Sequence, residues 1–444
     1  MKQQFRCIIM GAAGRDFHDF QCFFRERPQF RVCAFTATQI PYIEQRAFPR
    51  ELAGPHYDAD IPIHAESELS ELIARHAIDW VFLSYSDLPH EEVMHKASLV
   101  QAAGASFALL GPRATELVSA RPVVAVVASR TGAGKSPLSQ WLARGLSARG
   151  LRVGILRHPM PYGDLARQRT QRFATLADLD QAQCTIEERE EYAPYVEAGL
   201  TVHAGVDYAR VLAAADAEAD VILWDGGNND RAFVKADLQI CVIDALRPGH
   251  ETAYYPGETN LRRADVVVIA KSAGVARDVI DRMRERVASV NPRAAIVESD
   301  LRITVDDATL IRGRRTLVVE DGPTLTHGGM HYGAGALAAH AHGAASLVDP
   351  RPHAVGSIAT TLQAYPALRE VLPALGYSTA QLGDLAATIA AASTVTDVIV
   401  DASPAGLAHL IELPRPCVRV RYVFEQLGGP PLLETVFARC RTAS

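Results

Sequence analysis

The chain has 444 residues, of which 48% are hydrophobic and 22% are charged, and its formal net charge is −6. This length exceeds one ordinary core and predicts two or three domains, while the composition is typical of a globular protein and excludes a disordered or fibrous one. The negative charge argues against a general nucleic-acid binder.

Cysteine content and hydropathy point to a reducing, aqueous compartment. The seven cysteines form no C-x-x-C pair, so the sequence indicates neither a disulfide framework nor a thiolate zinc site. The N-terminus lacks a signal-peptide core, and no window offers the run of about 18 apolar residues that a membrane span needs. We therefore expect a cytoplasmic protein that binds neither membrane nor nucleic acid.

The first part of the chain alternates short apolar runs with amphipathic stretches. This rhythm predicts an α/β, Rossmann-like domain over residues 1–118, followed by a linker. We expect strands at 5–11, 30–37, 78–87 and 105–111 and helices at 19–28, 67–77 and 90–104.

A second α/β series starts at Val123. Its apolar strands and amphipathic helices predict a mostly parallel sheet covered by helices on both faces, with a phosphate-loop core over 119–330 and a C-terminal α/β extension over 331–444. Strands are expected at 123–128, 152–158, 219–225, 238–245, 264–270, 294–300, 316–321, 396–403 and 417–424, and helices from 135, at 276–290 and at 405–412.

The stretch ASRTGAGKS follows the first of these strands and precedes a helix. In a phosphate loop, backbone N–H groups surround an anion, a lysine reaches the terminal phosphates and a hydroxyl contacts magnesium. Ser129 replaces the first glycine of the usual pattern, but the rest of the pattern predicts a nucleotide site. Its residues would be Arg130, Thr131, Gly132, Ala133, Gly134, Lys135 and Ser136.

A magnesium ligand is expected at the end of a neighbouring strand. The run DVILWDGGNND supplies Asp225, which with Ser136 would hold the metal, and Asn228 and Asn229 could orient water or a phosphate. The alternative is that Asp225 caps a turn. We expect Lys135 and Asp225 to be catalytic, together with Arg157 and His158, which end the strand beside the phosphate loop.

The choice of purine stays open. The guanine-reading motif N-K-x-D is incomplete, because Ala270 and Ala273 replace its asparagine and aspartate. Lys271 could stack against a base or be an ordinary surface lysine, so we expect ATP or GTP with Mg²⁺.

Several polar clusters could bind a substrate. Arg15 and His18 suit a small anion, although the glycines around them could equally serve packing, and Arg167 belongs to an arginine group that could equally be a solvated helix face. Loops rich in glycine, histidine and carboxylate often build sites. Their candidates are Arg247, His250, Glu258, Thr326 and His327, and His327 with His331 also raises a metal site.

The chain resembles a known family over most of its length. The segments IIMGAAGRDFHDF, RTGAGKS, RHPMPYGDLA, ILWDGGNND, YYPGETN, EDGPTLTHGGM and DPRPHAVGSI are similar to phosphate-loop proteins described as predicted GTPases or cyclic 2,3-diphosphoglycerate synthetases. This resemblance implies ATP-dependent closure of an intramolecular phosphoanhydride in 2,3-diphosphoglycerate, a small phosphorylated metabolite, with magnesium and potassium. It implies that Gly132, Gly134, Lys135 and Ser136 bind ATP, that Asp225 holds magnesium and that arginines bind the substrate's phosphates. The departure AKSAGV weakens the GTPase description.

Two other functions remain open at this stage. The broader group of phosphate-loop proteins includes metallochaperones and often dimerises across the nucleotide, so the chain could be a homodimeric, nucleotide-switched binding module acting on a protein partner. The N-terminal unit could instead bind a dinucleotide in an oxidoreductase, but only two glycines of that fingerprint are present, at Gly11 and Gly14.

Overall fold

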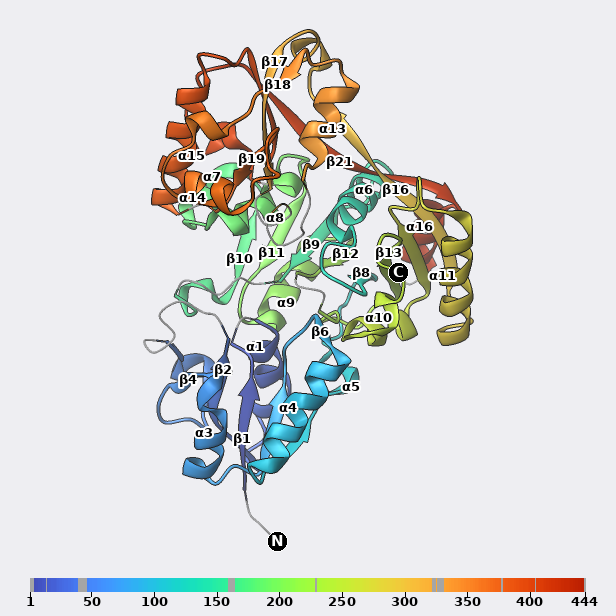
Figure 1. The fold of residues 1–444 in the computed structure, drawn as a ribbon. Coiled ribbons are helices and arrows are strands. Elements are labelled where there is room, and N and C mark those ends of the chain that lie inside the picture. The colour runs from blue at the N-terminus through green and yellow to red at the C-terminus, as the bar shows by residue number, and fades with distance from the viewer. Residues whose placement is uncertain are drawn as a thin grey trace. The chain divides into compact units, whose positions relative to one another are not determined.

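A computed structural model describes residues 4–12, 14–38, 46–158, 164–227, 230–321, 325, 331–376, 378–403 and 405–442. Parallel strands alternate with helices throughout, which confirms the predicted α/β class (Figure 1). The chain forms two compact units. Unit 1 contains Met1–Leu179, Pro194–Asp300 and Phe424–Ser444, and unit 2 contains Asp180–Ala193 and Leu301–Val423. The division at residues 118 and 330 stays a prediction.

The N-terminal sheet of unit 1 has the strand order β3-β4-β2-β1-β5-β7 and is parallel except for the β3–β4 pair. The chain leaves β1 toward one side for β2 and later returns to the other side for β5, so the strand order reverses beside β1. Ligands of open α/β sheets bind at such a point. The strands are β1 Phe5–Met10, β2 Phe30–Ala37, β3 Ala47–Phe48, β4 Ile61–Ala65, β5 Trp80–Leu83 and β7 Ser106–Ala108; the helices are α1 Arg15–Asp19, α2 Arg50–Ala53, α3 Leu69–His76, α4 His90–Ala102 and α5 Pro112–Thr115.

The second sheet of unit 1 has the order β10-β11-β9-β12-β8-β13-β15-β16, and only its β10–β11 pair is antiparallel. A two-stranded ribbon of β6 Leu88–Pro89 and β14 Tyr254–Tyr255 joins the two halves of unit 1. The strands are β8 Val123–Ala128, β9 Val153–Arg157, β10 Gln171–Phe173, β11 Thr201–Ala204, β12 Val221–Asp225, β13 Leu238–Asp244, β15 Val266–Ala270 and β16 Ala295–Val305; the helices are α6 Lys135–Ser147, α7 Leu176–Gln181, α9 Tyr208–Glu218, α10 Gly257–Arg263, α11 Arg277–Val290 and α16 Leu432–Thr442. Helix α8 Ile186–Val196 begins in unit 2 and ends in unit 1.

Burial explains why the central strands read as continuous apolar runs. Every residue of β8, β12, β13 and β15 is buried. A strand covered on both faces has no solvent-facing side that needs polar residues, so a continuous apolar run predicts such a strand. None of the described helices is both long and apolar enough to cross a membrane.

Some local predictions need correction. The helix expected at 19–28 is α1 followed by a π-helical segment at Phe20–Phe24, and the strand expected at 78–87 ends at Leu83. The helix expected at 405–412 is a single 3₁₀ turn, because Gly406 has a left-handed φ of 74° and interrupts helix geometry.

Unit 2 is a smaller parallel sheet in which β17 lies beside β18, β19 and β20, and β20 pairs with β21. Its core contains the apolar residues of β17 and β20 and of three helices. The strands are β17 Arg315–Asp321, β18 Ser346–Leu347, β19 Leu372–Ala374, β20 Val398–Ala402 and β21 Cys417–Gly428; the helices are α13 Ala334–Ala341, α14 Gly356–Ala364 and α15 Thr379–Ala392.

Glu320 makes the stability of unit 2 depend on pH. This carboxyl is 4% exposed and accepts hydrogen bonds from the amides of Gly333 and Ala336, and burial raises its pKa to about 7. A carboxyl with a raised pKa in the folded state contributes stability at low pH and loses it as the pH rises through that value. We expect the free energy of unfolding to fall by about 3 kcal/mol from this group between about pH 4.5 and pH 7.

Chemical denaturation of wild type and Glu320→Gln across that pH range measures the effect. The variant should show the shallower pH dependence. Two parallel profiles would contradict the assignment.

Candidate functional site

The loop between β8 and α6 has the backbone that a phosphate loop requires. Gly132 and Gly134 have φ values of 76° and 110°, in the region that glycine adopts without strain. Ser129 is not among the described non-glycine residues with positive φ, which are Ala77, Asp87, Gln183 and Lys271. The missing first glycine therefore imposes no backbone strain at that position.

Two cations hold the carbonyl groups of this loop. Lys271 Nζ donates to Gly132 O at 2.7 Å, and Arg247 Nη2 donates to Thr131 O at 2.9 Å. Both cations also bond Asp244, which ends the neighbouring strand β13: Lys271 Nζ lies 2.9 Å and Arg247 Nε 2.9 Å from Asp244 Oδ2. One buried carboxylate thus anchors both cations against the outer side of the loop.

This network gives Lys271 and Arg247 a structural place. Lys271 has a left-handed φ of 58°, a conformation that non-glycine residues rarely adopt and that its surroundings must maintain. Its ammonium is directed to the loop, so any contact with a base would use its aliphatic part. Arg247 bonds the loop through Thr131 O, and its role in substrate binding stays a prediction.

The loop is also bonded to the N-terminal half of unit 1. Asp87 Oδ1 accepts from Arg130 Nε at 3.0 Å and from the Thr131 amide at 3.3 Å. Arg130 stacks over the Tyr254 ring at 3.7 Å and donates to His250 Nδ1 at 3.1 Å. Burial and the adjacent arginine lower the pKa of His250, which favours the neutral ring that accepts this bond.

Asp225 ends β12 as predicted, and its side chain is fully buried. Its Oδ2 is paired with Arg157 Nη1 and accepts a hydrogen bond from Tyr195 OH at 2.5 Å. Burial raises the pKa of Tyr195 well above its usual range, so the phenol stays protonated and donates. Among the described residues Asp225 Oδ1 has no hydrogen-bond partner. A divalent cation could take this oxygen, since magnesium prefers oxygen ligands.

A cavity of about 350 Å³ lies where β1, β2 and β5 end. Residues from the phosphate-loop half of unit 1 complete its wall, among them Thr131 of the loop itself. Its lining contains Ala12, Arg15, Asp16, Ala37, Thr38, Ser84, Tyr85, Ser86, Asp87, Thr131, His158 and Asp230.

The two glycines after β1 are explained by this packing. Gly11 and Gly14 have φ values of 135° and 137°, and a Cβ on Gly14 would lie 2.1 Å from His158 Cε1. The absence of a side chain lets His158 approach the loop, where its Nε2 pairs with Asp230 Oδ2 at 2.8 Å. Close packing, rather than a dinucleotide, accounts for these glycines.

The structure brings Arg15 and His158 into this cavity but not His18. The ring of His18 stacks on Phe233 at 4.0 Å, and its Nε2 lies 2.7 Å from Thr115 O. Burial lowers the pKa of His18 well below its usual value, so it is a neutral packing residue.

Other predicted substrate residues lie outside the cavity. Arg167 is exposed and pairs with Asp164 at 3.6 Å, and Glu258 bonds Arg262 one helical turn away. Asn228, Asn229, Thr326 and His327 lie outside the described residues. His331 is exposed, and the described part of the chain contains no cluster of three or more metal-ligating side chains.

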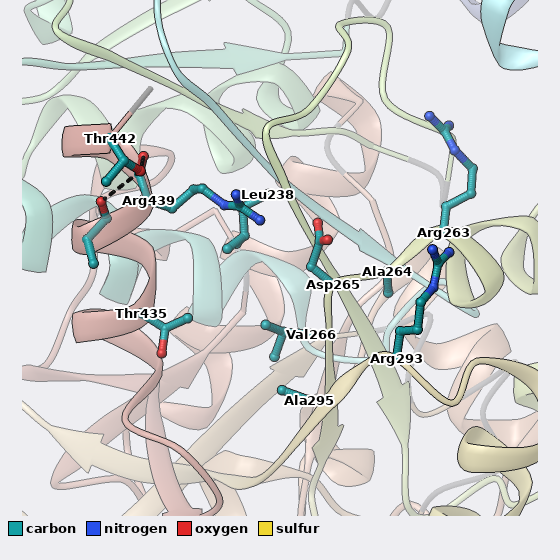
Figure 2. A pocket seen from close by; sticks show the side chains of 11 residues that line it. Leu238, Arg263, Ala264, Asp265, Val266, Arg293, Ala295, Thr435, Arg439 and Thr442 are labelled. Carbon is teal, nitrogen blue, oxygen red and sulfur yellow. Dashed lines mark hydrogen bonds between the residues drawn. The ribbon is translucent and has the colours of Figure 1, made fainter. Parts of the chain in front are cut away.

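A larger cavity of about 590 Å³ lies at the opposite strand ends (Figure 2). Leu238, Val266 and Ala295, at the starts of β13, β15 and β16, form part of its lining, and Arg263, Arg293 and Arg439 surround it. Ligands of parallel sheets bind at carboxyl ends, so the smaller cavity beside the phosphate loop is the better candidate site.

Sequence reasoning missed the roles of Asp87, Tyr195 and Asp244. Asp244 could have been found, because it ends an apolar strand in the same way as Asp225. Asp87 bonds Thr131, which is 44 residues away in the sequence, and Tyr195 bonds Asp225, which is 30 residues away. Neither residue lies in a local motif that would predict its contact.

No family model matches the sequence. The chain is 54% identical over 435 residues to the arginine synthetase ArcE of Thermococcus kodakarensis, covering 98% of this chain and 97% of the relative. The chain belongs to the arginine synthetase ArcE family. Membership in the ArcE family makes it an enzyme.

The resemblance to cyclic 2,3-diphosphoglycerate synthetases and predicted GTPases was therefore wrong, as were the phosphoanhydride-forming function and the switch alternative. A phosphate loop binds the phosphates of a nucleotide and carries no information on what receives them.

Similar solved structures are distant from this ArcE-family chain. LpxK from Aquifex aeolicus in complex with ATP is 12% identical, with a TM-score of 0.41 over 80% of this chain and 95% of LpxK. The hydrogenase maturation factor HypB from Archaeoglobus fulgidus is 16% identical, with a TM-score of 0.27 over 40% of this chain and 81% of HypB.

The Asp244 network makes a testable prediction for nucleotide binding. Asp244→Asn keeps the shape but removes the charge that anchors Lys271 and Arg247, so the affinity for ATP should fall by about 10- to 100-fold. Calorimetric titration of ATP measures it, with the surface variant Asp281→Asn as a control. Equal ATP affinity in wild type and Asp244→Asn would show that the network does not shape the loop.

Proposed function

We propose that this enzyme makes arginine in an ATP-dependent ligase reaction. The observation that carries the proposal is the 54% identity to an arginine synthetase over nearly the full length of both chains. The phosphate-loop backbone and the cavity beside it agree with a synthetase, since such an enzyme must hold a nucleotide and an acceptor side by side.

The chemistry of arginine restricts the reaction. Arginine differs from the ureido amino acid citrulline by one nitrogen in place of one oxygen at the terminal carbon. Transfer of the γ-phosphoryl group of ATP to the ureido oxygen converts that oxygen into a leaving group; ammonia then adds to the carbon, and phosphate departs. Citrulline, ammonia and ATP thereby give arginine, ADP and phosphate. Such a reaction needs positioning and charge neutralisation more than covalent chemistry from the protein.

The residues of the loop suit the nucleotide part. The amides of 132–136 would face the phosphates, with Lys135 neutralising their charge. Ser136 and Asp225 would hold a magnesium ion, which supplies positive charge to the phosphate oxygens when bound. Adenine is the base we propose, because Ala273 offers no carboxylate to accept hydrogen bonds from guanine.

The proposed reaction predicts a defined product balance. Purified protein with citrulline, ammonium and Mg-ATP should form arginine and ADP in equal amounts, and Lys135→Ala should lower the rate by about 100-fold or more. Amino-acid analysis and ADP detection measure both products. The exposed variant Lys235→Ala is the matched control and should keep wild-type activity. ADP release without arginine would refute the proposal.

A further inference from the structure

We propose that the cavity where β1, β2 and β5 end binds the head group of a zwitterionic α-amino acid, with Arg15 on the carboxylate and Asp230 on the ammonium group. The inference rests on the proposed function for its choice of amino acid. It adds a binding site and two recognition residues that similarity to a synthetase does not supply.

The cavity lies where ligands of open α/β sheets bind. The strand order of the N-terminal sheet reverses beside β1, and the cavity lies at the carboxyl ends of the strands on both sides of that point. Its volume of about 350 Å³ falls at the small end of ligand pockets, which start at about 300 Å³. A dinucleotide would need a larger site, whereas an amino acid fits this size.

Arg15 is a buried cation with one donor atom that lacks a partner among the described residues. This side chain is 7% exposed, its Nη1 donates to Arg231 O at 2.9 Å and its Nε lies 3.5 Å from Asp19 Oδ1. Its Nη2 is buried and has no hydrogen-bond partner in the described part of the chain. A buried charged donor without a partner costs free energy, so a ligand oxygen at this atom would remove a penalty as well as add a bond.

Asp230 lines the same cavity and carries an acceptor oxygen without a hydrogen-bond partner among the described residues. Asp230 is 3% exposed, and its Oδ2 pairs with His158, but its Oδ1 has no hydrogen-bond partner among the described residues. A buried donor without a partner on a cation and a buried acceptor without a partner on an anion match a ligand that carries both charges. A phosphate group would be repelled by Asp230 and by Asp16 on the same wall.

The cavity also places the rest of the ligand. Thr131 of the phosphate loop lines it, and the Thr131 amide is bonded to Asp87, another lining residue. An amino acid held by its head group at Arg15 and Asp230 would thus have its side chain inside a cavity that Thr131 of the phosphate loop lines.

Three probes separate the two contacts in the full-length protein: L-arginine, agmatine, which lacks only the carboxylate, and 5-guanidinopentanoate, which lacks only the amino group. Calorimetric titration should show that wild type binds L-arginine about 10- to 100-fold more tightly than either analogue. Arg15→Met should remove the preference over agmatine, and Asp230→Asn should reduce the preference over 5-guanidinopentanoate. Equal losses for all three probes, or no loss, would overturn the inference.

A second variant covers the case in which the buried substitutions do not fold. Thr38 is exposed and lines the cavity, so Thr38→Phe should fill its mouth without disturbing the core. It should weaken L-arginine binding by at least about 10-fold and leave ATP binding unchanged. Unchanged L-arginine binding would overturn the inference.

The outcomes distinguish the two proposals. Arginine formation by wild type with unaltered probe selectivity in the variants would refute the site and keep the proposed function. Selective, Arg15-dependent binding of L-arginine by a protein that forms no arginine would refute the function and keep the site.

Discussion

The phosphate loop depends on one buried carboxylate, Asp244, at the end of the neighbouring strand β13. Asp244 fixes Lys271 and Arg247, and these cations hold the carbonyl oxygens of Gly132 and Thr131. Since each peptide unit directs its carbonyl and N–H groups to opposite sides, anchoring the carbonyl groups favours N–H groups that face the anion. The glycines allow this conformation, but the charge network selects it. Ser129, which replaces the first glycine, has no positive φ and therefore imposes no backbone strain on the loop.

The same loop shares hydrogen bonds with the cavity that we propose as the amino-acid site. Asp87 follows β5 and lines the cavity. Its carboxylate accepts hydrogen bonds from Arg130 and from the Thr131 amide, so the cavity wall and the phosphate loop share hydrogen bonds. Around the cavity, Arg15 and Asp230 present opposite charges, each with one atom that the described residues leave without a partner. A ligase needs such a shared wall, because phosphoryl transfer requires donor and acceptor oxygen atoms to be held close together.

The predictable part of the molecule was local. Strands such as β8 and β12 were found because burial on both faces makes them continuous apolar runs, and the loop and Asp225 were found because both follow such runs directly. The roles of Asp244 and Asp87 depend on contacts between segments distant in the sequence. A local cluster of charges did not locate a site. Arg167 lies in a cationic stretch of the sequence, but its side chain is at the surface beside Asp164. The molecule that receives the phosphoryl group could not be predicted from the sequence, because a phosphate loop is complementary to the phosphates of the nucleotide and not to the acceptor.

The central claim is that phosphoryl transfer to the ureido oxygen activates the carbon that becomes the guanidinium carbon. Citrulline labelled with ¹⁸O at the ureido position tests it directly, because the labelled oxygen must leave with the transferred phosphoryl group. The account predicts that mass spectrometry will find the label in inorganic phosphate, one atom for each arginine formed. Arginine formation with the label in water and none in phosphate would contradict it.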